Sequence, residues 1–229
     1  MRKGKGILRP LQVDILRAFA RLPDADKFYL TGGTALAEFY FGHRHSFDLD
    51  LFTGVAGLVL PFSRTFEAML PSKLAEGTSV AVIRRFESFV EFEIKNAQDE
   101  TRVQLAIDSP FRFNAPEMSE YGIFVNNLED ITVDKLLAYF GRAEARDAVD
   151  LYFILKELDI QILIERAKKK DPGFDLYWMA VALEKVAQLP DDIRRWPVSM
   201  IADIDVRQLK ETLSGMATQF MNQIRDSRK

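Results

Sequence analysis

The segment between residues 28 and 52, FYLTGGTALAEFYFGHRHSFDLDLF, constrains the chain most, because it joins two adjacent glycines to two closely spaced aspartates. A short apolar and aromatic run leads into Gly32 and Gly33. The pattern predicts a helical stretch over residues 34–41 that ends at Gly42. The segment therefore predicts a strand, a glycine turn and a short helix in immediate succession.

The next stretch, residues 46–52, alternates apolar and polar side chains, which predicts a half-buried strand. Side chains two positions apart on a strand point to the same face, so Asp48 and Asp50 project together while Leu49 and Leu51 enter a core. Two adjacent like charges repel unless a cation lies between them or one carboxyl is protonated. Such a pair suits one or two Mg²⁺ ions, which bind a few carboxylates together with substrate phosphates.

The glycines indicate a phosphate ligand as well. A Gly-Gly pair at the start of a helix lets the backbone approach a ligand closely, and the N–H groups of a helix N-terminus favour phosphate. We expect Thr34 to cap this helix.

Glycines, a helix of about two turns and then two alternating aspartates form the layout of the DNA polymerase β type of nucleotidyltransferase fold. The segment more closely resembles the motif of the AbiEii/AbiGii toxin family of nucleotidyltransferases, in which GGTxL is followed by GHRxSxDxDLF. The matching residues are Gly32, Gly33, Thr34, Leu36, Gly42, His43, Arg44, Ser46, Asp48, Asp50, Leu51 and Phe52. The resemblance implies nucleotide contacts from Gly32, Gly33, Thr34, Arg44 and Ser46.

The two histidines, His43 and His45, fit no standard zinc spacing. His43 and Arg44 fall in the HR of the family pattern, where they either hold the loop or touch phosphate, and His45 stands at a variable position. Ser46 has two open interpretations, a hydrogen bond to phosphate or aspartate and a turn cap. The role of the histidines is left open.

Composition places few further limits on function. The 229 residues are 48% hydrophobic and 28% charged, as in ordinary globular proteins, and the net charge of −3 does not indicate a general nucleic-acid coat. The chain contains no cysteine, which excludes disulfides and cysteine-based zinc sites and fits a cytoplasmic location. No apolar run is long enough to span a membrane.

Three strand patterns follow, at 79–85, 89–95 and 102–108, and we interpret them as an antiparallel meander that extends the aspartate strand. In polymerase β type folds a third carboxylate lies beside the aspartate pair on a neighbouring strand, and by this resemblance Asp108 is the candidate. The alternative is that Asp108 starts the turn Asp-Ser-Pro at the end of its strand.

Residues 128–158 are expected to be largely helical. If they form one continuous helix, a polar stripe lies opposite an apolar face. The residues of the polar stripe are Lys135, Tyr139, Arg142, Arg146 and Asp150. Its three cations would match a triphosphate, and the alternative is a solvated face with an Arg146–Asp150 ion pair. The run also resembles the second motif of the toxin family, a lysine, an arginine seven residues later and an R-D-x-x-D-L ending; the matches are Lys135, Arg142, Arg146, Asp147, Asp150 and Leu151.

The expected fold class is α+β, a nucleotidyltransferase fold with a mixed or antiparallel sheet and flanking helices, followed by an all-helical C-terminal half. We place the boundary between a catalytic core, residues 1–126, and a helical domain, residues 127–229, that contributes its basic helix to the active site. Lys168, Lys169 and Lys170 are interpreted as a solvated helix end.

The resemblance implies a metal-dependent nucleotidyltransferase that moves a nucleoside monophosphate from an NTP to an acceptor, with RNA such as tRNA expected, and that acts as a toxin with a cognate antitoxin. Mg²⁺ or Mn²⁺ would bind Asp48, Asp50 and Asp108, and Lys135, Arg142 and Arg146 would hold phosphates. Catalysis is assigned to Asp48, Asp50, Asp108 and Lys135. The alternatives are phosphoryl transfer to a protein or an antibiotic and a nucleotide-binding relic without activity.

Overall fold

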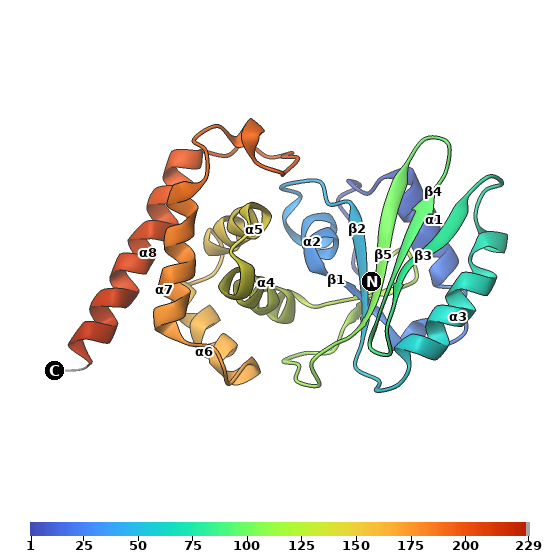
Figure 1. Ribbon diagram of the computed structural model, residues 1–229, viewed down its shortest axis with the longest axis horizontal. Helices are drawn as coiled ribbons and strands as arrows, with labels where there is room; N and C mark the ends of the chain where they lie inside the picture. The colour runs from blue at the N-terminus through green and yellow to red at the C-terminus, as the bar shows by residue number, and fades with distance from the viewer. Residues whose placement is uncertain (228–229) are drawn as a thin grey trace. The chain divides into compact units, whose positions relative to one another are not determined.

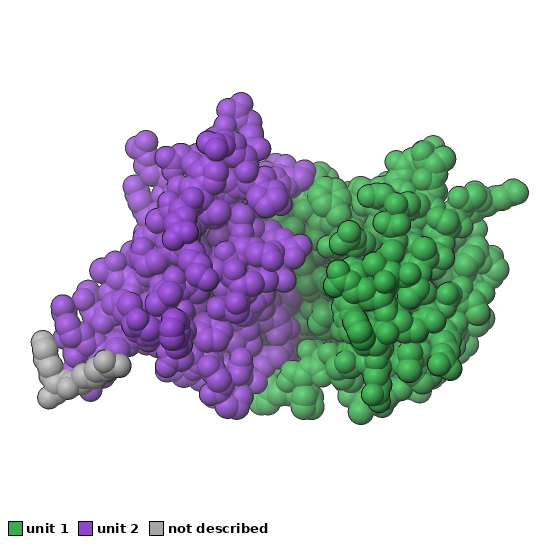
Figure 2. Space-filling model, in the orientation of Figure 1, with its two compact units in different colours: residues 1–128 green, residues 129–229 purple. Residues whose placement is uncertain are grey.

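The computed structural model describes residues 1–227 and separates into two compact units. Unit 1 comprises Met1–Leu128, and unit 2 begins at Glu129, close to the boundary expected after residue 126 (Figure 2). Unit 1 contains every strand of the described chain, and unit 2 is helical. The α+β class expected from the sequence is confirmed.

Unit 1 is built on one mixed seven-stranded sheet, in the order β3-β4-β5-β2-β1-β7-β6. Its strands are β1 (Tyr29–Thr31), β2 (Asp48–Thr53), β3 (Ser79–Arg85), β4 (Phe89–Lys95), β5 (Glu100–Ile107), β6 (Glu117–Met118) and β7 (Phe124–Val125). β3, β4 and β5 form the expected antiparallel meander. The meander extends the aspartate strand β2 through β5, and this junction is parallel, which makes the sheet mixed.

The helices of unit 1 lie on both sides of this sheet: α1 (Pro10–Phe19), α2 (Gly32–Leu36) and α3 (Val59–Met69). Figure 1 shows α3 on one side of the sheet and α2 on the other. On the α3 side, the ring of Phe66 lies 4.7 Å from that of Phe92, which shares its sheet face with the buried residues Leu49 and Val103. Apolar packing thus occupies this face and leaves the opposite face of β2 to the aspartates.

Unit 2 consists of the helices α4 (Leu128–Arg142), α5 (Ala145–Leu155), α6 (Ile160–Lys170), α7 (Leu176–Glu184) and α8 (Val206–Asp226). Aspartate side chains cap three of them, because Asp159, Asp175 and Asp205 each accept a backbone N–H from the first turn of α6, α7 and α8. α7 and α8 pack against each other. No helix within residues 1–227 is long and apolar enough to cross a membrane.

The single long helix expected over residues 128–158 is two helices. α4 ends at Arg142, Ala143 takes a left-handed φ of 50°, and α5 starts at Ala145. The N–H of Ala143 bonds the carbonyl of Tyr139 at 2.8 Å, which closes the last turn of α4. A common helical angle therefore does not relate residues before and after Ala143.

Candidate active site

The glycine turn after β1 is packed directly against functional side chains. Gly32 has a φ of 70°, which favours glycine, and a Cβ atom built there would overlap the carboxylate of Asp50. A Cβ atom on Gly33 would overlap the guanidinium of Arg44 and lie 3.0 Å from the hydroxyl oxygen of Ser46. The two glycines thus let the chain approach Asp50, Arg44 and Ser46 more closely than any other residue would.

The aspartate pair has the predicted arrangement on β2. Asp48 and Asp50 are half-buried on one face, while Leu49 and Leu51 are fully buried on the other. Asp50 is paired with Thr31 of β1, immediately before the glycine turn. Two half-buried carboxylates beside a glycine turn are hard oxygen donors, and this donor set suits Mg²⁺. Within residues 1–227 no group of three or more His, Cys, Asp or Glu side chains is placed to bind a metal.

Asp108 does not lie opposite either aspartate of this pair. Asp50 is opposite Gln104 on β5, and Asp108 is four residues farther along the chain, or about 13 Å at the rise of a strand. Its carboxylate accepts hydrogen bonds from the hydroxyl of Tyr29 and from the backbone N–H of Ser109 at 2.7 Å, and it lies 3.4 Å from Arg112. These contacts fit the interpretation of Asp108 as a turn residue, and its role as a third carboxylate stays a prediction.

The loop before β2 is held by its own hydrogen bonds. Arg44, although charged, is only 4% exposed, and it donates to the carbonyl of His45 at 3.1 Å. Gln12 of α1 donates to the carbonyl of Ser46 at 3.0 Å. Thr34 does not cap α2 as expected; its hydroxyl bonds the carbonyl of Asp48. These bonds fix the glycine turn and the aspartate strand to each other.

The helical stretch that follows the glycine turn ends at Gly42, as predicted. α2 continues into a π-helical turn, Ala37–Phe41, and Gly42 follows in the left-handed region at a φ of 65°. His43 is completely buried, and its ring lies 5.9 Å from that of Phe41 with an edge-on orientation. This packing supports a structural role for His43 in holding the loop.

The polar stripe predicted for the second motif is not an exposed face. Lys135 and Tyr139 are buried, at 6% and 1% exposure, whereas the arginines lie at the surface of unit 2. Arg146 lies 2.8 Å from Glu144 and not beside Asp150 as the solvated-face interpretation required. The break at Ala143 separates Lys135, Tyr139 and Arg142 on α4 from Arg146 and Asp150 on α5, so these five side chains do not form one stripe.

A buried ion cluster takes the place of that stripe within unit 2. The Lys135 ammonium lies 2.7 Å from Asp150 and 3.7 Å from Asp147, two carboxylates with no exposed side-chain surface. Arg142 binds Asp147 with two hydrogen bonds of 2.6 and 2.9 Å. Sequence reasoning matched both aspartates to the family motif but did not identify them as partners of Lys135.

The hydroxyl of Tyr139 belongs to the same cluster. It is buried and has no hydrogen-bond partner among the described residues. Burial, with a smaller contribution from the negative charge of Asp147, raises the pKa of Tyr139. This tyrosine therefore stays protonated at neutral pH.

A second buried lysine, Lys170, lies at the end of α6. It is 2.5 Å from Asp134 and 3.4 Å from Asp130, and its side chain is 4% exposed. The interpretation as a solvated helix end is therefore wrong for Lys170, while Lys168 and Lys169 are exposed as expected.

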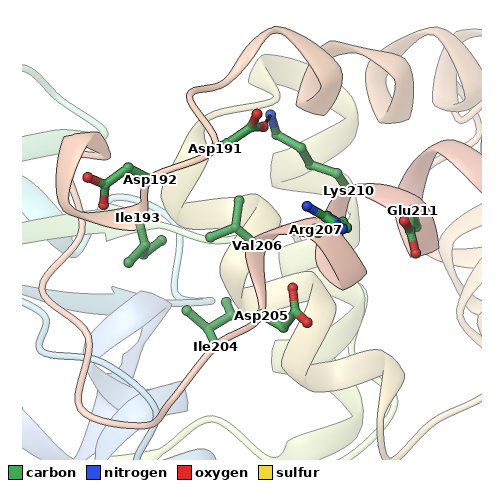
Figure 3. A pocket seen from close by; sticks show the side chains of 9 residues that line it. All are labelled: Asp191, Asp192, Ile193, Ile204, Asp205, Val206, Arg207, Lys210 and Glu211. Atoms are coloured by element: carbon green, nitrogen blue, oxygen red, sulfur yellow. Dashed lines mark hydrogen bonds and ion pairs between the residues drawn. The ribbon is translucent and has the colours of Figure 1, made fainter.

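The largest described pocket in unit 2, about 740 Å³, lies at the start of α8 (Figure 3). Its charged side chains are mostly paired or exposed; Lys210, for example, lies 2.5 Å from Asp191, and Asp205 caps α8. None of the site residues predicted from the sequence lines this pocket.

Comparison with known proteins gives a match that spans nearly the whole chain. Residues 14–226 match the family described as nucleotidyl transferase AbiEii toxin, type IV TA system. An uncharacterized protein from Aquifex aeolicus is 27% identical over 179 residues, covering 73% of this chain and 78% of the relative.

Two solved structures share the fold. JHP933 from Helicobacter pylori is 19% identical with a TM-score of 0.58 and 95% and 92% coverage of this chain and of that chain. The nucleotidyltransferase toxin MenT4 from Mycobacterium tuberculosis is 14% identical with a TM-score of 0.56 and 92% and 83% coverage. Both likenesses extend over the two units, although at these identities they bear on the fold alone.

Proposed function

Since the chain belongs to the AbiEii family of nucleotidyltransferase toxins, we propose that it transfers a nucleoside monophosphate from an NTP to an RNA acceptor such as tRNA. Family membership implies a nucleotidyltransferase that uses an NTP and has an antitoxin partner. The acceptor and the metal are our proposal. The observation that carries it is the face of β2 on which Asp48 and Asp50 stand beside the glycine turn.

The roles of the residues in unit 1 follow from this arrangement. Asp48 and Asp50 would hold Mg²⁺ or Mn²⁺, which when bound stabilises negative charge on the phosphates and favours ionisation of the attacking hydroxyl. Gly32 and Gly33 let the backbone of the turn lie against Asp50 and Arg44, where we propose that its N–H groups contact the triphosphate. The acceptor hydroxyl would attack the α-phosphorus, a new phosphodiester bond would form, and pyrophosphate would leave.

The side chains that frame the turn complete the proposed nucleotide site. Arg44 and Ser46 lie at Gly33, where a guanidinium and a hydroxyl can bind phosphate oxygens. Thr34 acts through the backbone, because its hydroxyl holds the strand that carries Asp48. For Lys135, Arg142 and Arg146 of unit 2 we propose phosphate contacts on the strength of the family motif that they match.

The deciding experiment follows the label of an NTP that carries radioactive phosphorus at either the α- or the γ-position. Each of the four NTPs is incubated with the protein, Mg²⁺ and either total RNA or total protein, and the products are separated by electrophoresis. We expect the α-label to appear in RNA and the γ-label to leave as pyrophosphate. Transfer of the γ-label to a protein or small molecule would instead show a phosphotransferase, and transfer of neither label would refute both activities.

A further inference from the structure

The strand register places five side chains in one row across the open face of the sheet. The Cα partners run from β1 through β2, β5 and β4 to β3 as Thr31, Asp50, Gln104, Glu91 and Arg84. Directly paired residues in neighbouring strands point to the same face, and neighbouring strands are about 4.8 Å apart. Gln104 is therefore the side chain next to Asp50 on the β5 side, and Glu91 follows it.

Glu91 is a buried carboxylate in this row. It is only 4% exposed, although Arg84 and Arg102 on either side are exposed. The amide Nε2 of Gln104 donates to Glu91 Oε1 at 3.2 Å, and the two guanidinium groups lie 3.5 and 3.9 Å from the carboxylate. A buried charge is unfavourable unless it is paired and hydrogen-bonded, so this network has a defined geometry.

The chemistry of the Gln104–Glu91 bond fixes which way the amide faces. A carboxylate only accepts hydrogen bonds, so the amide must turn its NH₂ group toward Glu91. The carbonyl oxygen, Oε1, is then directed away from Glu91, in the row where the next side chain is Asp50. Glu91 is thus the group that sets the orientation of an uncharged oxygen beside the aspartate pair.

We propose that Gln104, oriented by Glu91, is a positioning residue of the active site whose Oε1 is the third oxygen beside Asp48 and Asp50. This inference rests on the proposed function, because it assigns Gln104 a place at the same Mg²⁺ or Mn²⁺ site. A neutral amide oxygen can bind Mg²⁺ directly or accept a hydrogen bond from its bound water, and it adds no third negative charge to a site with two carboxylates. In this proposal Gln104 takes the place that the fold resemblance suggested for Asp108.

The test measures Mn²⁺ binding to the full chain without nucleotide, from the electron paramagnetic resonance signal of free Mn²⁺. Gln104→Met keeps the length of the side chain but removes its oxygen, and Glu91→Gln removes the carboxylate that orients the amide. Partners of metal ligands typically change metal affinity by about tenfold or more, so we expect both variants to raise the Kd for Mn²⁺ about tenfold. Glu93→Gln is the matched control, because Glu93 lies on the same strand and face but pairs with Lys95, and its Kd should be unchanged.

A purely structural role would lower the melting temperature of the Gln104 and Glu91 variants without changing Mn²⁺ affinity, and that result would overturn the proposal. Glu91→Gln decides if Gln104→Met does not fold: it leaves Gln104 in place but no longer fixes the direction of its amide, and an unchanged Kd for Mn²⁺ would count against the inference. Asp48→Asn distinguishes failure of the proposed metal site from failure of the Gln104 assignment. If the Gln104, Glu91 and Asp48→Asn variants all bind Mn²⁺ like the parent, the metal site of the proposed function fails. If Asp48→Asn loses Mn²⁺ binding while the Gln104 and Glu91 variants keep it, only the assignment of Gln104 fails.

Discussion

The contact between the glycine turn and Asp50 predicts a specific effect of Gly32→Ala. Alanine at the φ of 70° observed for Gly32 costs about 1–2 kcal/mol, because Cβ crowds the following carbonyl in the left-handed region. The new Cβ atom would also overlap the Asp50 carboxylate, so that the carboxyl group must move away from its position beside Asp48. We therefore expect loss of metal and nucleotide binding in addition to a modest loss of stability.

The matched control is Gly57→Ala. Gly57 has a nearly equal φ of 76°, but a Cβ atom there meets nothing within 4 Å. Both alanines share the same backbone strain, and each should lower the melting temperature by about 2–8 °C for a chain of this size. Only Gly32→Ala displaces a functional carboxylate, so any difference between the two in ligand binding reports that displacement.

The assay is thermal unfolding in chelator and again with Mg²⁺ and NTP. At a ligand concentration of about one hundred times Kd the parent and Gly57→Ala should gain about 2.7 kcal/mol, whereas a hundredfold weaker Kd in Gly32→Ala leaves about 0.4 kcal/mol. Nucleotide transfer should fall together with this gain. If Gly32→Ala keeps the full ligand-dependent shift and full transfer, the close approach of the turn to Asp50 has no role in binding, and the reasoning is refuted.

Three further predictions use other parts of the structure. Lys135→Ala leaves the buried Asp150 without its nearest cation and should destabilise unit 2 by about 3–5 kcal/mol, and calorimetry should show that adding Asp150→Ala restores part of this loss. Lys170→Ala should lower the melting temperature strongly, while the exposed Lys169→Ala should leave it unchanged; equal effects would contradict the buried ion pairs of Lys170. Expression of the chain should slow bacterial growth and Asp48→Ala should relieve this, whereas equal arrest by both forms would show a non-catalytic effect.

Local sequence rules predicted the geometry of the candidate site in unit 1 because that geometry is local. Alternation placed Asp48 and Asp50 on one face of β2, and the glycine pair marked the turn that packs against Asp50. Alternation also gave the face of each strand in the meander. It does not give register or direction between strands, so nothing in the sequence placed Gln104 and not Asp108 beside Asp50.

The second motif shows the same limit for helices. Periodicity predicts one face of one continuous helix, and the one local sign of a kink near Ala143 is Gly141, which is unfavourable inside a helix. The chain nevertheless turns at Ala143, and the turn brings Asp147 and Asp150 of α5 against Lys135 of α4. The break between α4 and α5 thus occurs together with ion pairs between the two helices. Helical propensity, which is a local property, does not predict such ion pairs.

The charge balance around Lys135 bears on the phosphate contacts proposed for unit 2. Lys135 and Arg142 face Asp147 and Asp150, so these four side chains carry no net charge and do not attract a triphosphate as three free cations would. A phosphate that binds Lys135 must share it with Asp150 or replace that carboxylate as its partner. Because Asp150 already holds the ammonium in one position, such an exchange orders no further side chain, and this keeps the entropic cost of phosphate binding low. Lys135 is thus both a structural and a proposed binding residue, and variants of it must be judged on stability and affinity together.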